Sequence, residues 1–286
     1  MMAVRKLRYQ HALTTLCRVL GVNRSSYYKH YKSKPSARSI ENQEIRSKIL
    51  VLYSAAKKRL GARKMQQRLS VEYGIKISLG RIYRLMKAMD LPKMSTVKPY
   101  VKPGKAKEEK LPCPNHVNKN FSVPAQNLVW VSDISYVKVG GKFCYVCVII
   151  DLFSRKVIAY QAGEQADTQL VVKTFLSAFH RRNPEPNTLI FHSDRGCQYT
   201  SKVFRNLLDS CQVTQSFSAP GYPFDNAVAE SFFKYLKKEE LDRRKYSCIE
   251  DLKLSLFQFI VGFYNSIRPH SANDMLSPDE KEASFV

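Results

Sequence analysis

Three apolar, strand-like segments follow one another in the middle of the chain, over Leu128–Val139, Lys142–Phe153 and Lys156–Ala162. The dipeptide Gly140-Gly141 predicts a tight turn between the first two, and Ser154-Arg155 lies between the second and third. Such short connections favour antiparallel neighbours, because parallel strands need a crossover of a dozen or more residues. This stretch therefore predicts an antiparallel three-stranded meander.

The rest of the chain after this meander alternates helices with strands. Apolar periodicity predicts strands over Thr188–His192 and Val213–Phe217, and helices over Thr168–His180, Ser201–Cys211, about Ala227–Arg243 and about Ile249–Ser266. Three antiparallel strands followed by helix, strand, helix and strand is the order of a ribonuclease-H-like fold. We expect an α/β protein with a ribonuclease-H-like core over residues 128–286, preceded by small all-α helix-turn-helix units.

The positive charge of the chain is concentrated in its first part. Residues 1–110 contain 27 Lys and Arg against 6 Asp and Glu, a net charge of +21 out of the total of +23. Residues 111–286 contain 20 Lys and Arg against 18 Asp and Glu, a net charge of +2. A one-sided basic block indicates contact with a polyanion such as nucleic acid. The alternative is a solvated surface that only keeps the protein soluble.

The basic part contains two helical units. Residues 10–32 predict two helices separated at Gly21, which fits either a short helix-turn-helix-like unit over residues 1–32 or an ordinary helical hairpin. A polar linker is expected over residues 33–40. Residues 41–91 predict a helical DNA-binding domain, with an ordinary helical bundle as the alternative. Its helices are expected over Glu41–Ser54, Ala62–Glu72 and Leu79–Met89, and the last exposes Arg81, Arg84 and Lys87 as DNA contacts.

Six prolines alternate with lysines between residues 92 and 127. This composition predicts a basic, Pro-rich linker, whose extended character suits a strap along DNA.

Three acidic residues lie where the predicted fold could bring them together. Asp133 falls inside the first strand, Asp194 just past the fourth, and Glu230 on a helix. Because the first and fourth strands are neighbours in this fold, both aspartates are expected at one place. Glu230, Lys234 and Lys237 share one helix stripe, since they stand at positions i, i+4 and i+7.

Carboxylates in this arrangement suit two divalent cations held against a phosphodiester. We expect Mg²⁺, with Mn²⁺ as a possible substitute, and assign Asp133 as the bridging ligand, Asp194 to one ion and Glu230 to the other. Lys234 and Lys237 are expected to contact DNA phosphates. A zinc site at Cys144 and Cys147 is not expected, because three residues of separation on a strand place the two thiols on opposite faces.

Two further acids compete with this set. Asp151 closes a strand and reads as a turn residue. Asp225 precedes the helix of Glu230 and reads as its N-cap.

Four motifs stand in order along the chain: W-x-x-D-I-S-Y-V, F-H-S-D-R-G-x-Q-Y-T-S, P-x-D-N-A-x-A-E-S-F-F-x-x-L-K and Y-N-S-x-R-P-H. With CRVLGVNRSSYY and YSAAKKRLGARKMQQRL nearer the N-terminus, they make the chain resemble the second-frame proteins of the IS-three family of bacterial insertion sequences. That family lies in the DDE transposase and retroviral-integrase superfamily. The resemblance implies that Asp133, Asp194 and Glu230 form the catalytic triad and that Lys237 is its basic partner.

The resemblance also implies an activity and its partners. It implies a DNA transposase that cleaves at the terminal inverted repeats of its element and joins the ends to target DNA, using a 3′-hydroxyl nucleophile. It further implies a homo-oligomer on DNA and an upstream-frame protein, or a frameshift fusion with it. The alternatives are a non-catalytic DNA-binding regulator of transposition and a metal-dependent nuclease of the same fold.

No window of about 18 apolar residues is present, so we expect no membrane span. The basic N-terminus lacks the apolar region of a signal peptide. We expect a cytoplasmic protein associated with the bacterial nucleoid.

Overall fold

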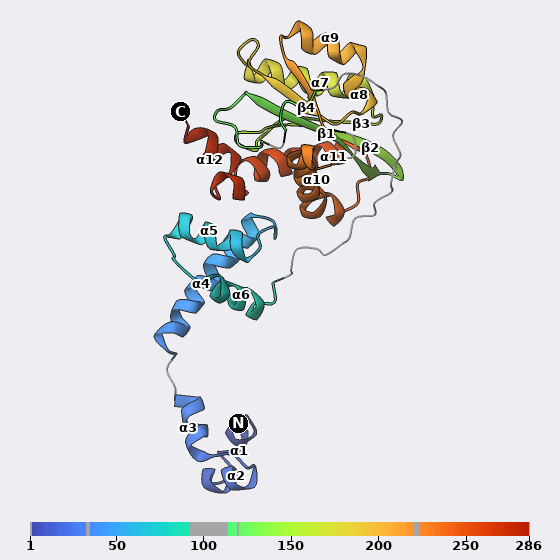
Figure 1. Cartoon of the computed structure of the whole chain (residues 1–286). Helices are drawn as coiled ribbons and strands as arrows, with labels where there is room; N and C mark the ends of the chain where they lie inside the picture. The colour runs from blue at the N-terminus through green and yellow to red at the C-terminus, as the bar shows by residue number, and fades with distance from the viewer. Residues whose placement is uncertain (1, 33–34, 92–113, 119, 220–222, 286) are drawn as a thin grey trace.

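The computed structural model describes residues 2–32, 35–91, 114–118, 120–219 and 223–285 (Figure 1). Over these residues it contains a five-stranded sheet in the order β3-β2-β1-β4-β5. The strands are β1 (Val129–Val139), β2 (Lys142–Asp151), β3 (Val157–Gly163), β4 (Ile190–Ser193) and β5 (Thr214–Phe217). β1, β2 and β3 are antiparallel neighbours, whereas β4 pairs parallel with both β1 and β5. This topology confirms the predicted ribonuclease-H-like α/β core.

The turn between β1 and β2 is built from its two glycines. Gly140 and Gly141 have φ angles of +53° and +87°, a conformation that side chains with a Cβ adopt with strain. A Cβ on Gly140 would also meet the Ser247 carbonyl oxygen at 2.8 Å. The turn and the close backbone approach explain why both positions are glycine.

Helices cover both faces of the sheet (Figure 1). One face packs against α7 (Thr168–Arg182), α8 (Cys197–Thr200) and α9 (Lys202–Ser210), through a cluster that includes Cys147, Phe175 and Phe204. The other face packs against α10 (Ala227–Glu239) and α11 (Ile249–Phe259), through a cluster that includes Cys144, Val146 and Phe232. Cys144 and Cys147 thus lie on opposite faces, as expected from their spacing.

Short turns extend or join the C-terminal helices. The predicted helix over about Ala227–Arg243 ends at Glu239 and is followed by the 3₁₀ turn η2 (Leu241–Arg243). The predicted last long helix changes to a π-helical segment, η3 (Ile260–Asn265), before η4 (Ser271–Asn273) and α12 (Pro278–Ala283).

The π segment explains the Y-N-S-x-R-P-H motif. It turns the amide of Asn265 toward β3, where it bonds both the N–H and the carbonyl of Val157 at 3.0 Å. Arg268 pairs with the Glu239 carboxylate at 2.7 and 2.9 Å, and both residues are buried. The motif therefore fastens the C-terminal helices to the core.

The N-terminal residues form α1 (Met2–Leu7), α2 (Leu13–Val19) and α3 (Arg24–Lys32) around Val4, Leu16, Cys17 and Tyr27. The break after α2 lies at Gly21, where φ is +61°, as its position in the sequence predicted. The helix α1 was not predicted.

The second helical unit consists of α4 (Ala37–Ala55), α5 (Ala62–Tyr73) and α6 (Leu79–Ala88) around Ile45, Ile49, Met65, Leu69 and Ile82. The predicted polar linker over residues 33–40 is wrong in its second half, because α4 begins at Ala37. Ser36 caps this helix by accepting a hydrogen bond from the Ser39 N–H at 3.2 Å. The same apolar cluster continues from these helices into the α10 and α11 side of the core.

Part of the predicted Pro-rich linker packs on the core. Residues 92–113 and 119 lie outside the described residues. From Pro114 onward the chain lies beside β5, since the Phe217 N–H donates to the Pro114 carbonyl at 3.0 Å and the His116 N–H donates to the Ser216 hydroxyl at 2.9 Å. Further on, Arg155 donates to the Phe121 carbonyl at 2.7 Å. The described part of the predicted linker therefore lies against the core, and its role as a strap along DNA stays a prediction.

None of the helices that the structure describes is long and apolar enough to cross a membrane.

Candidate active site

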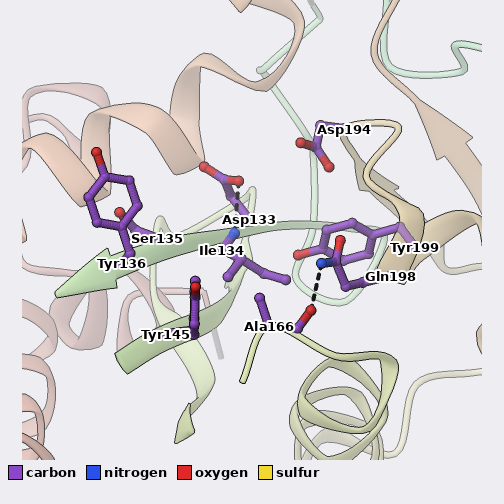
Figure 2. A pocket seen from close by; sticks show the side chains of 9 residues that line it. All are labelled: Asp133, Ile134, Ser135, Tyr136, Tyr145, Ala166, Asp194, Gln198 and Tyr199. Carbon is purple, nitrogen blue, oxygen red and sulfur yellow. Dashed lines mark hydrogen bonds between the residues drawn. The ribbon is translucent and has the colours of Figure 1, made fainter. Parts of the chain in front are cut away.

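Asp133 and Asp194 emerge at the same edge of the sheet. β1 and β4 pair in parallel from Val129 to Val131, so Asp133 lies two residues past the paired region. Asp194 directly follows the end of β4. Both positions therefore lie just beyond the paired part of the two parallel neighbours, and both aspartates line one pocket of about 220 Å³ (Figure 2). The structure therefore brings these two side chains together, as predicted.

The remaining wall of the pocket comes mainly from the α7 and α8 face of the sheet. Tyr136 and Tyr145 line it from the two central strands, and Gln198 lines it from α8 (Figure 2). The Gln198 amide donates to the Ala166 carbonyl at 2.7 Å. The Tyr199 hydroxyl lies 2.8 Å from the Ser132 hydroxyl, in a buried cluster directly behind Asp133.

The negative charges of the site act on one another. Loss of water around Asp133 raises its pKa to about 7, and the charges of Asp194 and Glu230 push in the same direction. The Ile134 N–H, which donates to Asp133 at 2.8 Å, and the charge of Lys237 oppose the rise. Partial loss of water also raises the pKa of Asp194, against a hydrogen bond of 3.0 Å from the Gly196 N–H. Burial therefore disfavours the charged forms of both aspartates, and the neighbouring carboxylates add to this effect at Asp133.

Glu230 stands to one side of this pair. It lies in the first turn of α10, exposed to solvent, and it does not line the pocket of the two aspartates. Among the described residues, no three His, Cys, Asp or Glu side chains come close enough to one another to hold a metal ion. The structure thus assembles two of the three predicted ligands, with the third near enough to act on Asp133 through its charge.

The two lysines of α10 lie away from its buried apolar side, as their spacing predicted. Lys234 is exposed and Lys237 half-buried, whereas Phe232 and Leu236 are buried against the sheet. The Lys237 ammonium lies 4.8 Å from the centre of the Tyr136 ring, beside the pocket. Loss of water lowers the pKa of Lys237, and the charges of Asp242 and Asp133 act in the opposite direction.

The three predicted DNA contacts on α6 differ in their surroundings. Arg81 is bound to its own domain, because its guanidinium pairs with Glu41 at 2.7 and 3.0 Å and with Asn42 at 2.8 Å. Arg84 and Lys87 are exposed.

The two competing acids have structural roles. Asp151 is buried and accepts from the N–H groups of Asn127 at 2.8 Å and Phe153 at 2.9 Å, which fits its reading as a turn residue. Asp225 is not the N-cap of α10. It lies in the 3₁₀ turn η1 (Pro223–Asn226), and its carboxylate accepts from the Ala219 N–H and the Asn115 amide, both at 2.9 Å. The reading as an N-cap is wrong because the helix begins one residue later, after Asn226.

Sequence reasoning missed Asn226. Its side-chain amide donates to the Ser132 carbonyl at 3.0 Å, next to Asp133. The available signal was its place beside Asp225 in the motif, four residues before Glu230.

The donor set fits hard divalent cations. Asp133, Asp194 and Glu230 offer carboxylate oxygens, which Mg²⁺ and Mn²⁺ prefer. Burial, and after it the charges of Asp194 and Glu230, raise the pKa of Asp133, and a cation bound here would favour its charged form.

Family models match most of the chain. The description "Integrase core domain" applies to residues 123–223 and, in a second model, to residues 211–278. The description "HTH-like domain" applies to residues 40–99.

Curated relatives match over nearly their whole length. The chain is 32% identical over 249 residues to the transposase for insertion sequence element IS904 of Lactococcus lactis, covering 87% of this chain and 97% of the relative. It is 29% identical over 282 residues to the transposase InsF for insertion sequence IS3A of Escherichia coli, covering 98% and 96%. The crystallised catalytic core of BIV integrase is 20% identical, with a TM-score of 0.41 over 56% of this chain and 95% of that one. The integrase core, the HTH-like domain and the two insertion-sequence transposases show that the chain belongs to the transposases of the IS-three family of insertion sequences, within the DDE and retroviral-integrase superfamily.

Proposed function

We propose that this DNA transposase uses Asp133, Asp194 and Glu230 as the metal ligands of a phosphodiester transfer that cuts and joins the ends of an insertion sequence. The observation that carries the proposal is that Asp133, just past the part of β1 paired with β4, and Asp194, just past the end of β4, line one pocket. Glu230 completes the set from α10, where its charge already acts on Asp133.

The chemistry exchanges one phosphodiester for another. The oxygen of a DNA 3′-hydroxyl attacks phosphorus in the target strand, a new P–O bond forms, and the strand's own 3′-oxygen leaves and takes up a proton. Divalent cations supply neutralisation of the phosphate charge and activation of the attacking oxygen. Asp133 would hold both ions, Asp194 one and Glu230 the other. Lys237, beside the pocket, is suited to bind a phosphate of the DNA end.

DNA is the proposed partner of the basic N-terminal part. We assign residues 1–32 and 41–91 to DNA binding, residues 92–127 to the connection and residues 128–286 to catalysis. The exposed Arg84 and Lys87 on α6 are proposed phosphate contacts, together with Lys234 and Lys237 on α10. Terminal inverted repeats, target DNA, a homo-oligomer on DNA and an upstream-frame protein are the proposed partners, and the bacterial nucleoid is the proposed site of action.

Strand transfer with labelled element ends tests the proposal. Purified protein, with and without the upstream-frame product, is incubated with end DNA and a target plasmid in Mg²⁺ or Mn²⁺. Joined products that require the metal are expected. Hydrolysed ends without joined products would instead indicate a nuclease, and DNA binding without any cut product would indicate a regulator.

A further inference from the structure

Asn226 directly precedes α10, the helix that carries Glu230, but its side chain does not cap that helix. Asn226 occupies the N-cap position of α10, with φ −114° and ψ 29°, and its side chain makes no capping hydrogen bond. An asparagine at this position ordinarily accepts a hydrogen bond from an N–H in the first turn of its own helix. Here the side-chain amide instead donates to the Ser132 carbonyl on β1 at 3.0 Å, and both residues are buried. The side chain of Asn226 therefore joins the start of α10 to the sheet instead of bonding the first turn of its own helix.

The position of this bond relates it to two of the acids. The Ser132 carbonyl belongs to the peptide unit that joins Ser132 to Asp133. Glu230 follows Asn226 by four residues, which is about 6 Å along a helix axis. One hydrogen bond therefore links the backbone that carries Asp133 to the helix turn that carries Glu230.

The environment of Asn226 argues against a role in packing alone. Its Oδ1 is buried without a hydrogen-bond partner in the described part of the chain, which is unfavourable. An apolar side chain would fill the same space without an orphaned oxygen. The neighbouring Asp225 does not duplicate the bond, because its carboxylate binds Ala219 and Asn115 rather than β1.

We infer that Asn226 is a positioning residue, whose hydrogen bond to the Ser132 carbonyl sets the separation between Glu230 and Asp133. The inference rests on the proposed function, since it concerns how these carboxylates come to share metal ions. Apolar packing holds α10 against the sheet but leaves its position along β1 loosely defined, whereas one directional bond at the helix start defines it.

The chain offers a closely matched control. Asn273, in η4, is fully buried, and its side-chain amide donates to the Ser154 carbonyl at 2.6 Å. Its Oδ1 is also buried without a partner among the described residues. The same substitution at Asn226 and at Asn273 therefore removes the same kind of bond, but only Asn226 bonds the strand next to Asp133.

The experiment compares Asn226→Ala and Asn226→Asp with Asn273→Ala and Asn273→Asp in the full chain. Binding of Mn²⁺ to the DNA-free protein is followed by electron paramagnetic resonance of the unbound ion, well below the lowest melting temperature. The Asn226 variants are expected to bind Mn²⁺ about 10- to 100-fold more weakly than wild type, the range found when a group that orients a metal ligand is removed. The Asn273 variants are expected to lose thermal stability to a similar extent and to bind Mn²⁺ as wild type does.

Strand transfer provides a second readout. Part of the activity lost by Asn226→Ala should return at high Mn²⁺, because its ligands are present but misplaced. Wild-type Mn²⁺ affinity in Asn226→Ala would overturn the inference while leaving the proposed function intact, and so would equal weakening by the Asn273 variants. A wild-type protein that binds no Mn²⁺ would overturn both. If Asn226→Asp fails to fold, Asn226→Ala, which adds no charge, decides the question.

Discussion

Arg59, in the connection between α4 and α5, forms a buried ion pair with Glu240, directly after the end of the helix that carries Glu230. The Arg59 Nε also donates to the Glu239 carbonyl at 3.2 Å. Its guanidinium lies 5.4 and 5.0 Å from the ring centres of Phe259 and Phe263. The second helical unit is thus held to the C-terminal end of α10 by a buried ion pair.

Breaking this pair should strongly destabilise the protein. Arg59→Met leaves the Glu240 carboxylate buried, with Arg244 at 2.8 Å as a remaining partner. Removing one member of a buried pair typically costs about 3–5 kcal/mol, and the remaining partner should keep the loss near the lower value. Urea denaturation measures it. The double variant Arg59→Met/Glu240→Leu should regain much of the loss, because no uncompensated charge remains.

The pair between Arg68 and Glu72 is the control for Arg59. These residues stand four apart on α5 and are partly exposed, at 18% and 31% of their side-chain surfaces. Arg68→Met should cost less than about 1 kcal/mol. An equal loss for both variants, or a double variant no more stable than Arg59→Met, would show that the Arg59 pair is not what fastens the two units.

The three acids should be required for transfer and dispensable for DNA binding. Asp133→Ala, Asp194→Ala and Glu230→Ala should each reduce strand transfer by about 1,000-fold or more, because metal ligation stabilises the transition state by several kcal/mol. DNA affinity should change little, since it rests on the basic N-terminal part. Gel-shift and transfer assays on the same preparations test this, and full transfer by any one variant would remove that residue from the triad.

The arrangement of the two aspartates could be predicted from sequence because it follows from strand order alone. Apolar runs around Asp133 and before Asp194 define strands, and the parallel pairing of these two strands places both residues just beyond the paired region. The position of Glu230 could not be predicted to the same degree. It depends on where α10 begins, next to Asp225 and Asn226, whose side chains bond residues far away in sequence.

The number of basic residues in the first part of the chain likewise did not predict which of them are available to bind DNA. Arg59 and Arg81 contribute to the excess of positive charge in the first part of the chain, but both form ion pairs with acidic residues of the same chain, Arg59 in the interior and Arg81 at the surface. Composition reveals the number of charges in a segment, whereas their availability for DNA depends on tertiary contacts.

This difference predicts distinct effects on α6. Arg84→Ala and Lys87→Ala should weaken DNA binding uniformly across sequences, and each should reduce the slope of log affinity against log salt by about 1. Arg81→Ala should instead lower the melting temperature of the helical unit, because it releases Glu41 and Asn42. Binding titrations between low and physiological salt test this, and an unchanged slope in the Arg84 and Lys87 variants would exclude them as phosphate contacts.

Lys237 should contribute to transfer through its charge. Lys237→Ala should weaken transfer about 10- to 100-fold without unfolding α10, since alanine is a good helix former. Lys237→Arg should retain more activity, because it keeps the charge and can still stack on Tyr136. Both variants are compared at equal folded concentration, with thermal melts as a check. Strand transfer at the wild-type level by Lys237→Ala would show that Lys237 does not contribute to the reaction.

His270 should make the protein less stable in mild acid. Burial lowers the pKa of His270 to about 3, and the positive charges of Arg268, Arg155 and Lys64 act in the same direction. An unfolded histidine titrates near pH 6.5, so between about pH 6.5 and pH 3 the unfolded chain binds a proton that the folded chain excludes. The free energy of unfolding must therefore fall as the pH is lowered through this window.

The substitution His270→Gln separates this effect from the titration of carboxylates. Glutamine does not titrate, and its side-chain oxygen can replace Nδ1 as the acceptor for the Ala272 N–H, which donates to His270 at 3.3 Å. Between pH 7.5 and pH 5 the wild type should lose up to about 2 kcal/mol more than the variant, because its unfolded state alone gains the extra proton. Urea denaturation at both pH values measures the difference. Parallel losses in the two proteins would mean that His270 takes up its proton as readily in the folded state as in the unfolded one, and that the three neighbouring cations do not exclude it.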